Sequence, residues 1–81
     1  MKLYLISQTE NNDYDTYDSA VVCAESLEDA KTIHPSDWQE GAWSRSYSGW
    51  ASSPENVFAY YIGEAGEDME RGVVLASFNA G

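Results

Sequence analysis

The chain has 81 residues, of which 43% are hydrophobic and 14% aromatic, and 14 acidic residues against four basic ones give a formal net charge of −10. This apolar content exceeds that of a disordered chain, and the length is enough for one domain, which we expect to span residues 1–81. The negative charge argues against direct binding of nucleic-acid phosphates or of anionic membranes. It favours a basic protein surface as partner, although net charge also serves solubility alone.

Cellular location is indicated by two features of the sequence. The single cysteine cannot form an internal disulfide, which suits a reducing compartment. No signal peptide is visible at the start of the chain, and no stretch approaches the ~18 apolar residues that cross a bilayer. We therefore expect a cytoplasmic protein.

The first 25 residues predict two strands. Residues 2–7 alternate as a strand, and residues 9–17 form a polar, turn-rich connection. A second strand is expected over 19–25, because its continuous apolar run, residues 20–24, is typical of a strand covered on both faces.

A short helix is expected at about 27–34. Ser26 stands at the N-cap position, and Asp29 completes a capping box three residues later. Pro35 disfavours helical angles in the residue before it, so the helix should end by then. The helical spacing places three apolar residues on one face: Leu27, Ala30 and Ile33.

Residues 36–56 form the least regular segment and contain all three tryptophans, namely Trp38, Trp43 and Trp50. We expect two of the three to lie in the core and one to be exposed. The segment is longer than most connections in a compact domain, and such loops are often functional. Ser53, Pro54 and Glu55 predict one helical turn, because proline suits the first helical position.

The last part of the chain predicts two further strands. Residues 57–62 are the clearest strand by composition, with alternate residues on opposite faces and Gly63 as its end. Residues 73–78 form the last strand, paired with the third as a hairpin over the acidic connection 64–71. The fold class is therefore α+β, with the order β-β-α-β-β. A four-stranded, mainly antiparallel sheet carries one short helix on a face and a long tryptophan-containing loop.

No combination of residues predicts catalysis or a cofactor. The spacing of Asp13, Asp15 and Asp18 resembles a calcium loop, but Tyr17 stands at a ligand position and the required glycine is missing. Cys23 lies in the predicted buried strand, which favours an inert core thiol over a nucleophile. A structural zinc site needs about four nitrogen or sulfur ligands, and the chain has one cysteine and one histidine. We therefore expect no enzyme, metal or cofactor. A small enzyme that uses carboxylates and His34 is the alternative.

Two surface features favour binding to another protein. One is a pair of acidic clusters in separate loops; if the strands bring these loops to one end, the carboxylates imitate a phosphate backbone. The other is a set of tyrosines and a tryptophan in loops, since these residues anchor interfaces. Solvated turns and lids over a thin core are the alternative interpretations. The first cluster consists of Glu10, Asp13, Asp15 and Asp18, and the second of Glu64, Glu67, Asp68 and Glu70. The partner-binding residues that we predict are Asp13, Tyr14, Asp15, Tyr17, Asp18, Glu64, Glu67, Asp68, Glu70 and Trp43.

Three segments also carry a resemblance: MKLYLISQ at the start, YDTYDSAVVCAES with the nearby EDA and IHP, and GVVLASFNAG at the end. They resemble a set of small uncharacterised proteins encoded by phages, prophages and bacterial genomes. In size, acidity and scarcity of cysteine, the chain is similar to phage inhibitors of host defence such as anti-CRISPR proteins, several of which are acidic nucleic-acid mimics.

The resemblance implies an inhibitor that occupies a basic, nucleic-acid-binding surface of a host defence complex. The alternatives are an immunity protein or antitoxin against a basic nuclease or toxin, and an accessory module with no defence role. The oligomeric state stays open, because either of the last two strands can form an edge that pairs with another chain.

Overall fold

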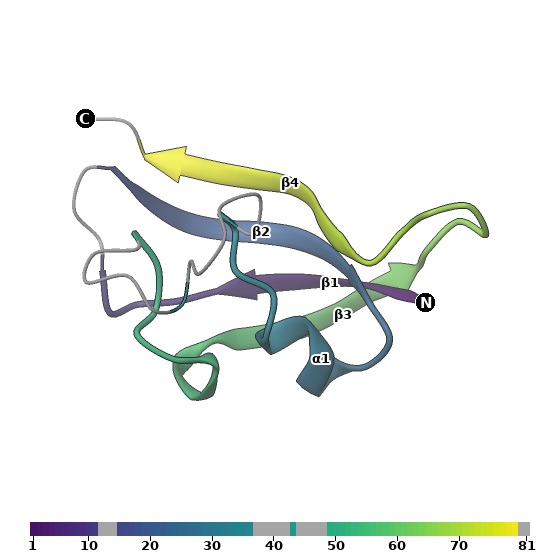
Figure 1. The fold of residues 1–81 in the computed structure, drawn as a ribbon, viewed down its shortest axis with the longest axis horizontal. Coiled ribbons are helices and arrows are strands. Elements are labelled where there is room, and N and C mark those ends of the chain that lie inside the picture. Colours follow the sequence, from purple (N-terminus) through teal and green to yellow (C-terminus); the bar gives the residue numbers. More distant parts are fainter. Residues whose placement is uncertain (12–14, 37–42, 44–48, 80–81) are drawn as a thin grey trace.

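The computed structural model describes residues 1–11, 15–36, 43 and 49–79. It confirms the predicted α+β class, with four strands and one short helix (Figure 1). Among the described residues, no helix is long and apolar enough to cross a membrane. The elements are β1 (Lys2–Ser7), β2 (Thr16–Ala24), α1 (Leu27–Lys31), the 3-10 turn η2 (Pro54–Asn56), β3 (Phe58–Glu64) and β4 (Gly72–Asn79).

The sheet has the strand order β3-β1-β2-β4, and every neighbouring pair is antiparallel. The predicted hairpin between the last two strands is therefore wrong, because β3 and β4 lie at opposite edges (Figure 1). The connection 65–71 crosses the end of the sheet. Three interstrand steps amount to about 14 Å, which seven extended residues can span. The pair β1–β2 has two free edges: β3 pairs with the free edge of β1, and β4 pairs with the free edge of β2.

Three strands are longer than the sequence predicts, and one of them, β4, extends the predicted 73–78 by one residue at each end. β2 begins at Thr16 rather than 19, because its first residues pair with the end of β4, where Thr16 opposes Asn79. β3 passes through Gly63 instead of ending there. The extra residue of a bulge opposite Leu3 and Tyr4 is Ile62. Gly63 follows it, and its φ of 159° favours glycine. Pairing between distant segments thus overrides the local turn composition.

The predicted cap of α1 is present. Ser26 Oγ accepts a hydrogen bond from Asp29 N at 3.0 Å, and Asp29 Oδ2 accepts one from Glu25 N at 3.1 Å. The first bond satisfies a backbone donor that the first helical turn leaves unpaired. The second binds the residue before the N-cap rather than Ser26 N, which a capping box would use. The helix is shorter than predicted, since it ends at Lys31 with Thr32 as C-cap.

The expected apolar face of the helix is only partly correct. Ala30 and Ile33 are buried, but Leu27 is exposed. Because the helix ends before Ile33, helical spacing does not align that residue with Leu27.

The core lies on one face of the sheet, under α1 and the segment that leads to β3. Trp50 is buried in this core and Trp43 packs against it, while Trp38 lies outside the described residues. The buried apolar residues are Tyr4, Ile6, Ala20, Val22, Ala24, Ala30, Ile33, Trp50, Ala51 and Val57.

Gly49 attaches the segment before β3 to the start of β2. Its carbonyl accepts a hydrogen bond from Tyr17 N at 2.8 Å, and its φ is 70°. A Cβ atom there would lie 2.8 Å from the carbonyl oxygen of Asp15. The backbones approach so closely that only glycine fits without strain.

Candidate binding surfaces

The two acidic clusters lie at opposite ends of the sheet (Figure 1). The β1–β2 connection adjoins Ser7 and Phe58, whereas the β3–β4 connection adjoins Lys2, whose partners in the sheet are Ala24 and Glu64. The molecule measures 35 × 22 × 22 Å along its principal axes. The clusters therefore do not form the single negative surface that the sequence analysis considered.

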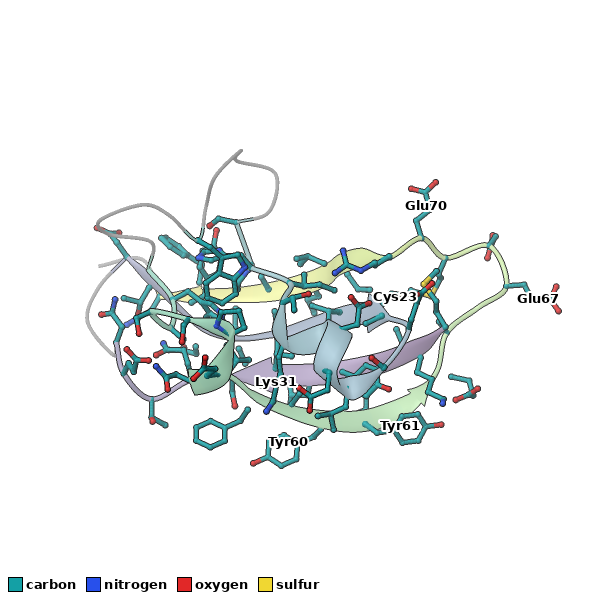
Figure 2. The ribbon with its side chains drawn as sticks, turned by 60° about the horizontal axis from the view of Figure 1, so that its bottom comes forward. Cys23, Lys31, Tyr60, Tyr61, Glu67 and Glu70 are labelled. Atoms are coloured by element: carbon teal, nitrogen blue, oxygen red, sulfur yellow. The ribbon has the colours of Figure 1, made fainter. Side chains whose placement is uncertain are left out.

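Among the residues that the structure describes, the β3–β4 side has five exposed carboxylates and the opposite end has four. The end of β2 adds Glu25 to the predicted cluster, because Ala24 opposes Lys2 beside the same connection. Figure 2 shows Glu67 and Glu70 pointing outward from the connection. We name this group the β3–β4 acidic end; its exposed carboxylates are Glu25, Glu64, Glu67, Asp68 and Glu70.

The cations beside this acidic end are few, and one of them is engaged by a carboxylate outside it. Arg71 Nη2 lies 2.8 Å from Asp29 Oδ1, and Arg71 Nε lies 2.9 Å from Asp29 Oδ2. The hydrogen bond from Arg71 is the main cause that holds the pKa of Asp29 below its ordinary value; the bond from Glu25 N acts in the same direction, and burial opposes both. Lys2 and the N-terminal amine of Met1 are the other cations that the structure describes there, so the five carboxylates still outnumber the cations.

Glu64 is also hydrogen-bonded to a tyrosine. Tyr61 Oη donates to Glu64 Oε2 at 2.7 Å, on an exposed part of β3. This bond to a carboxylate is the main cause of a raised pKa of Tyr61, because ionising the phenol removes the donor and places two negative charges side by side. Tyr61 also packs edge-on against Tyr4, which orients the ring over the helix side of the sheet.

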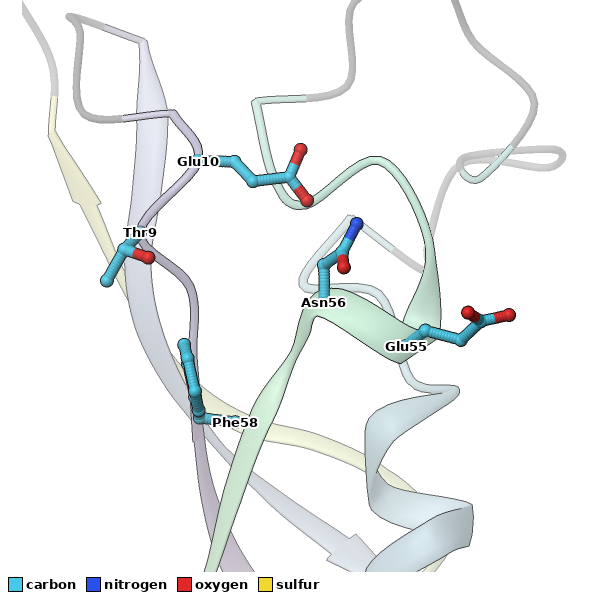
Figure 3. Close-up of a pocket in the computed structure, with 5 residues that line it drawn as sticks. All are labelled: Thr9, Glu10, Glu55, Asn56 and Phe58. Carbon is cyan, nitrogen blue, oxygen red and sulfur yellow. The ribbon is translucent and has the colours of Figure 1, made fainter.

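The opposite end carries Glu10, Asp15, Asp18 and Glu55, of which Glu10 and Glu55 line a pocket of about 280 Å³ (Figure 3). The pocket does not bring these two carboxylates together. Figure 3 shows Glu10 and Asn56 pointing toward each other, whereas Glu55 points away. Glu10 Oε1 accepts from Ser52 Oγ at 3.2 Å. The arrangement positions a loop, and the paired carboxylates of acid–base catalysis do not face each other here.

Two predicted partner-binding aromatics have structural contacts. Tyr17 lies in β2 and packs on Phe78 of β4, with ring centroids 4.8 Å apart. Trp43 Nε1 donates to the carbonyl oxygen of Thr32 at 2.8 Å and so satisfies an acceptor at the end of α1. Asp13 and Tyr14 lie outside the described residues.

Cys23 and His34 are both buried, as is common for a core thiol and a packed imidazole. The Cys23 Sγ lies 4.0 Å from the sulfur of Met1. His34 Nδ1 accepts a hydrogen bond from Ser36 N at 3.0 Å, and its ring stacks edge-on against Trp43. Within the described part of the chain, no group of three His, Cys, Asp or Glu is arranged to hold a metal ion.

The sheet face opposite α1 is the surface that the sequence analysis missed. Four residues cross it in register, Leu75, Val21, Leu5 and Tyr60, and Leu75 is 70% exposed. Solvent-facing strands usually alternate apolar with polar residues. Residues 57–62 indicate this surface in the sequence, because both faces of that predicted strand carry apolar or aromatic residues.

Comparison of the chain with protein-family models, with curated proteins and with solved structures finds no match. The geometry of the described surfaces is therefore the basis on which a function is proposed.

Proposed function

We propose that the protein is an inhibitor that acts by binding, and that its β3–β4 acidic end occupies a basic, nucleic-acid-binding surface of a host defence complex. The observation that carries the proposal is the exposure of Glu25, Glu64, Glu67, Asp68 and Glu70 at one narrow end of the molecule. Carboxylates grouped in this way attract Arg and Lys side chains that otherwise hold phosphates.

The proposed contact uses one end of the molecule. Because the two clusters lie at opposite ends of the 35 Å axis, the second cluster would point away from a surface that the first one meets. The residues that we assign to the contact are therefore those of the β3–β4 acidic end. Trp43 and Tyr17 would support the fold, since their contacts are internal.

The phage and host setting of the proposal derives from the sequence resemblance, and the protein would act in the host cytoplasm. A target surface that binds nucleic acid is favoured over a generic basic patch, because a net charge of −10 steers association toward strongly positive grooves. The inhibitor would then act stoichiometrically by exclusion of the nucleic acid.

The test is affinity purification of the tagged protein from a bacterial lysate, with washes at about 0.1 M and about 1 M salt. The Debye length falls from about 10 Å to about 3 Å over this range, so a contact between charges weakens strongly. We expect a nucleic-acid-binding defence complex to be captured at low salt, to be released at high salt and to be displaced by a short duplex of DNA or RNA. Capture that resists both treatments, or no enrichment at all, would refute the proposal. Capture of a basic nuclease or toxin would replace the defence complex as the target and favour an immunity protein.

A further inference from the structure

The central part of the sheet face opposite α1 combines apolar residues with serines and has no covering layer among the described elements. Pairing places two rows of side chains on it: Leu75, Val21, Leu5 and Tyr60 in one, and Ser77, Ser19, Ser7 and Phe58 in the other. All eight positions are uncharged, in a chain of net charge −10. We name these eight residues the open face.

The open face is uneven, with two exposed aromatic rings on one side and a hollow on the other. Phe58 and Tyr60 stand on the β3 side and are about half exposed. On the other side, Leu5, Val21 and Leu75 line a hollow of about 280 Å³ together with Ser19, Ser77 and the strand segments that contain Ala20 and Ala76. The aromatic rings and the hollow lie at the same level along the strands, because Phe58 shares a row with Ser77 and Tyr60 shares one with Leu75.

We infer that the open face is the interface of a homodimer in which two sheets stack face to face. A two-fold axis parallel to the strands lays β3 of one copy over β4 of the other. This operation keeps each residue at its level along the strands, so it places Phe58 and Tyr60 of each copy over the hollow of its partner. The contact is made twice, as an isologous interface requires. Stacked sheets pack about 10 Å apart, with interdigitated side chains.

The size and charge of the open face fit a second copy of the chain. Its exposed side chains, at roughly 200 Å² for a large residue, offer at most about 500 Å² per copy. Two copies then bury at most about 1,000 Å², which is at the lower limit of specific interfaces and indicates a weak dimer. An acidic chain can approach a second copy of itself most easily through an uncharged face, since like charges in direct contact are costly.

The same axis brings the β3–β4 acidic ends of the two copies to the same end of the dimer. Their repulsion opposes association, and salt screens that repulsion. Dimerisation should therefore strengthen as salt rises, which is opposite to the salt dependence expected for capture of a basic target. The dimer leaves both acidic ends exposed, so the inference does not depend on the proposed function.

Sedimentation equilibrium of the full chain from about 10 µM to about 1 mM, at low and at high salt, tests the inference. We expect a monomer–dimer equilibrium with a dimer dissociation constant that is several-fold lower at high salt. Leu75→Glu should raise this constant at least tenfold. Leu27→Glu adds the same charge on the exposed start of α1 and should leave it unchanged.

Dilution followed by NMR locates the contact without a variant, and shifts confined to Leu75, Ser19, Ser77 and the two aromatic rings are expected. A wild-type chain that is monomeric throughout the concentration range would overturn the inference. An equal effect of both substitutions, or dilution shifts elsewhere, would overturn it too. If the wild-type chain is monomeric and Leu75→Glu, but not Leu27→Glu, captures less protein from the lysate, the open face binds a different partner.

Discussion

Arg71, the residue directly before β4, forms a bidentate ion pair with Asp29 in the first turn of α1, 42 positions earlier. Its Nε and Nη2 donate hydrogen bonds to both carboxylate oxygens. Asp29 simultaneously accepts from Glu25 N. One carboxylate thus joins the end of β2, the helix and the start of β4. The pair is partly exposed, with 47% of the Arg71 side chain and 24% of the Asp29 side chain accessible, so solvent screening limits its contribution.

Asp29→Asn should reduce the free energy of unfolding by about 1 kcal/mol at pH 7, because it removes the charge from the cap and from the ion pair. The pKa of Asp29 is lower in the folded chain than the ordinary value of 3.8, so its contribution is present above that value. The contribution is lost as the pH falls through the folded-state pKa. Urea unfolding at pH 7 and near pH 3 measures the difference.

The control for this prediction is Glu28→Gln, which removes one carboxylate from the neighbouring exposed position of the same turn. It should change the stability by less than about 0.5 kcal/mol. A difference between wild type and Asp29→Asn that persists unchanged near pH 3 would contradict the assignment.

Gly49→Ala should destabilise the fold by at least about 1–2 kcal/mol. The φ of 70° is unfavourable for alanine, and the new Cβ would meet the Asp15 carbonyl oxygen at 2.8 Å. Gly66→Ala is the matched control, since its Cβ would approach the Asp68 side chain at 3.4 Å, and a surface change there should stay within about 0.5 kcal/mol. Chemical denaturation of both variants compares them, and equal stabilities would disprove the close approach at Gly49.

Glu64→Gln should lower the pKa of Tyr61 toward its ordinary value of 10.0, because the negative acceptor of the phenol hydrogen bond is replaced by a neutral one. An NMR titration that follows the tyrosine Cζ resonances reports each phenol separately. Glu67→Gln removes a charge from the nearby connection and should leave the Tyr61 titration nearly unchanged. If both variants shift it equally, the effect arises from the general field of the acidic end.

Trp43→Phe should reduce the free energy of unfolding by about 1 kcal/mol through loss of the hydrogen bond to the Thr32 carbonyl. Tyr60→Phe removes a polar atom from an exposed aromatic residue and should be nearly neutral. Thermal or urea unfolding compares the two variants. Unchanged stability together with loss of captured protein would return Trp43 to the partner-binding role that the sequence analysis gave it.

Local sequence signals predicted what depends on near neighbours along the chain. Ser26 and Asp29 are three residues apart, and their cap is present as expected. The alternation in residues 57–62 correctly separates Val57, Ala59 and Tyr61 from the opposite face, because side chains alternate along a strand.

The features that were predicted wrongly depend on contacts between segments that are distant in the sequence. A seven-residue connection can close a hairpin or cross the end of a sheet, and the composition of 65–71 does not distinguish the two. This choice sets the strand order, and the strand order sets which acidic residues share an end. The place of Glu25 at the acidic end and the ion pair between Arg71 and Asp29 were therefore missed. Tyr17 was assigned to a loop, although it pairs with Phe78 in the sheet.

If the β3–β4 acidic end makes the contact with the target, the position of its carboxylates should matter as well as their charge. Two double variants separate position from charge: one carries Glu67→Gln and Glu70→Gln, and the other carries Asp18→Asn and Glu55→Gln. Each pair removes two exposed carboxylates, so the variants have equal net charge and differ in the end that they neutralise. We expect the first pair to lose most of the low-salt capture and the second to retain it. Equal losses would mean that net charge alone drives capture, and a loss confined to the second pair would place the contact at the opposite end.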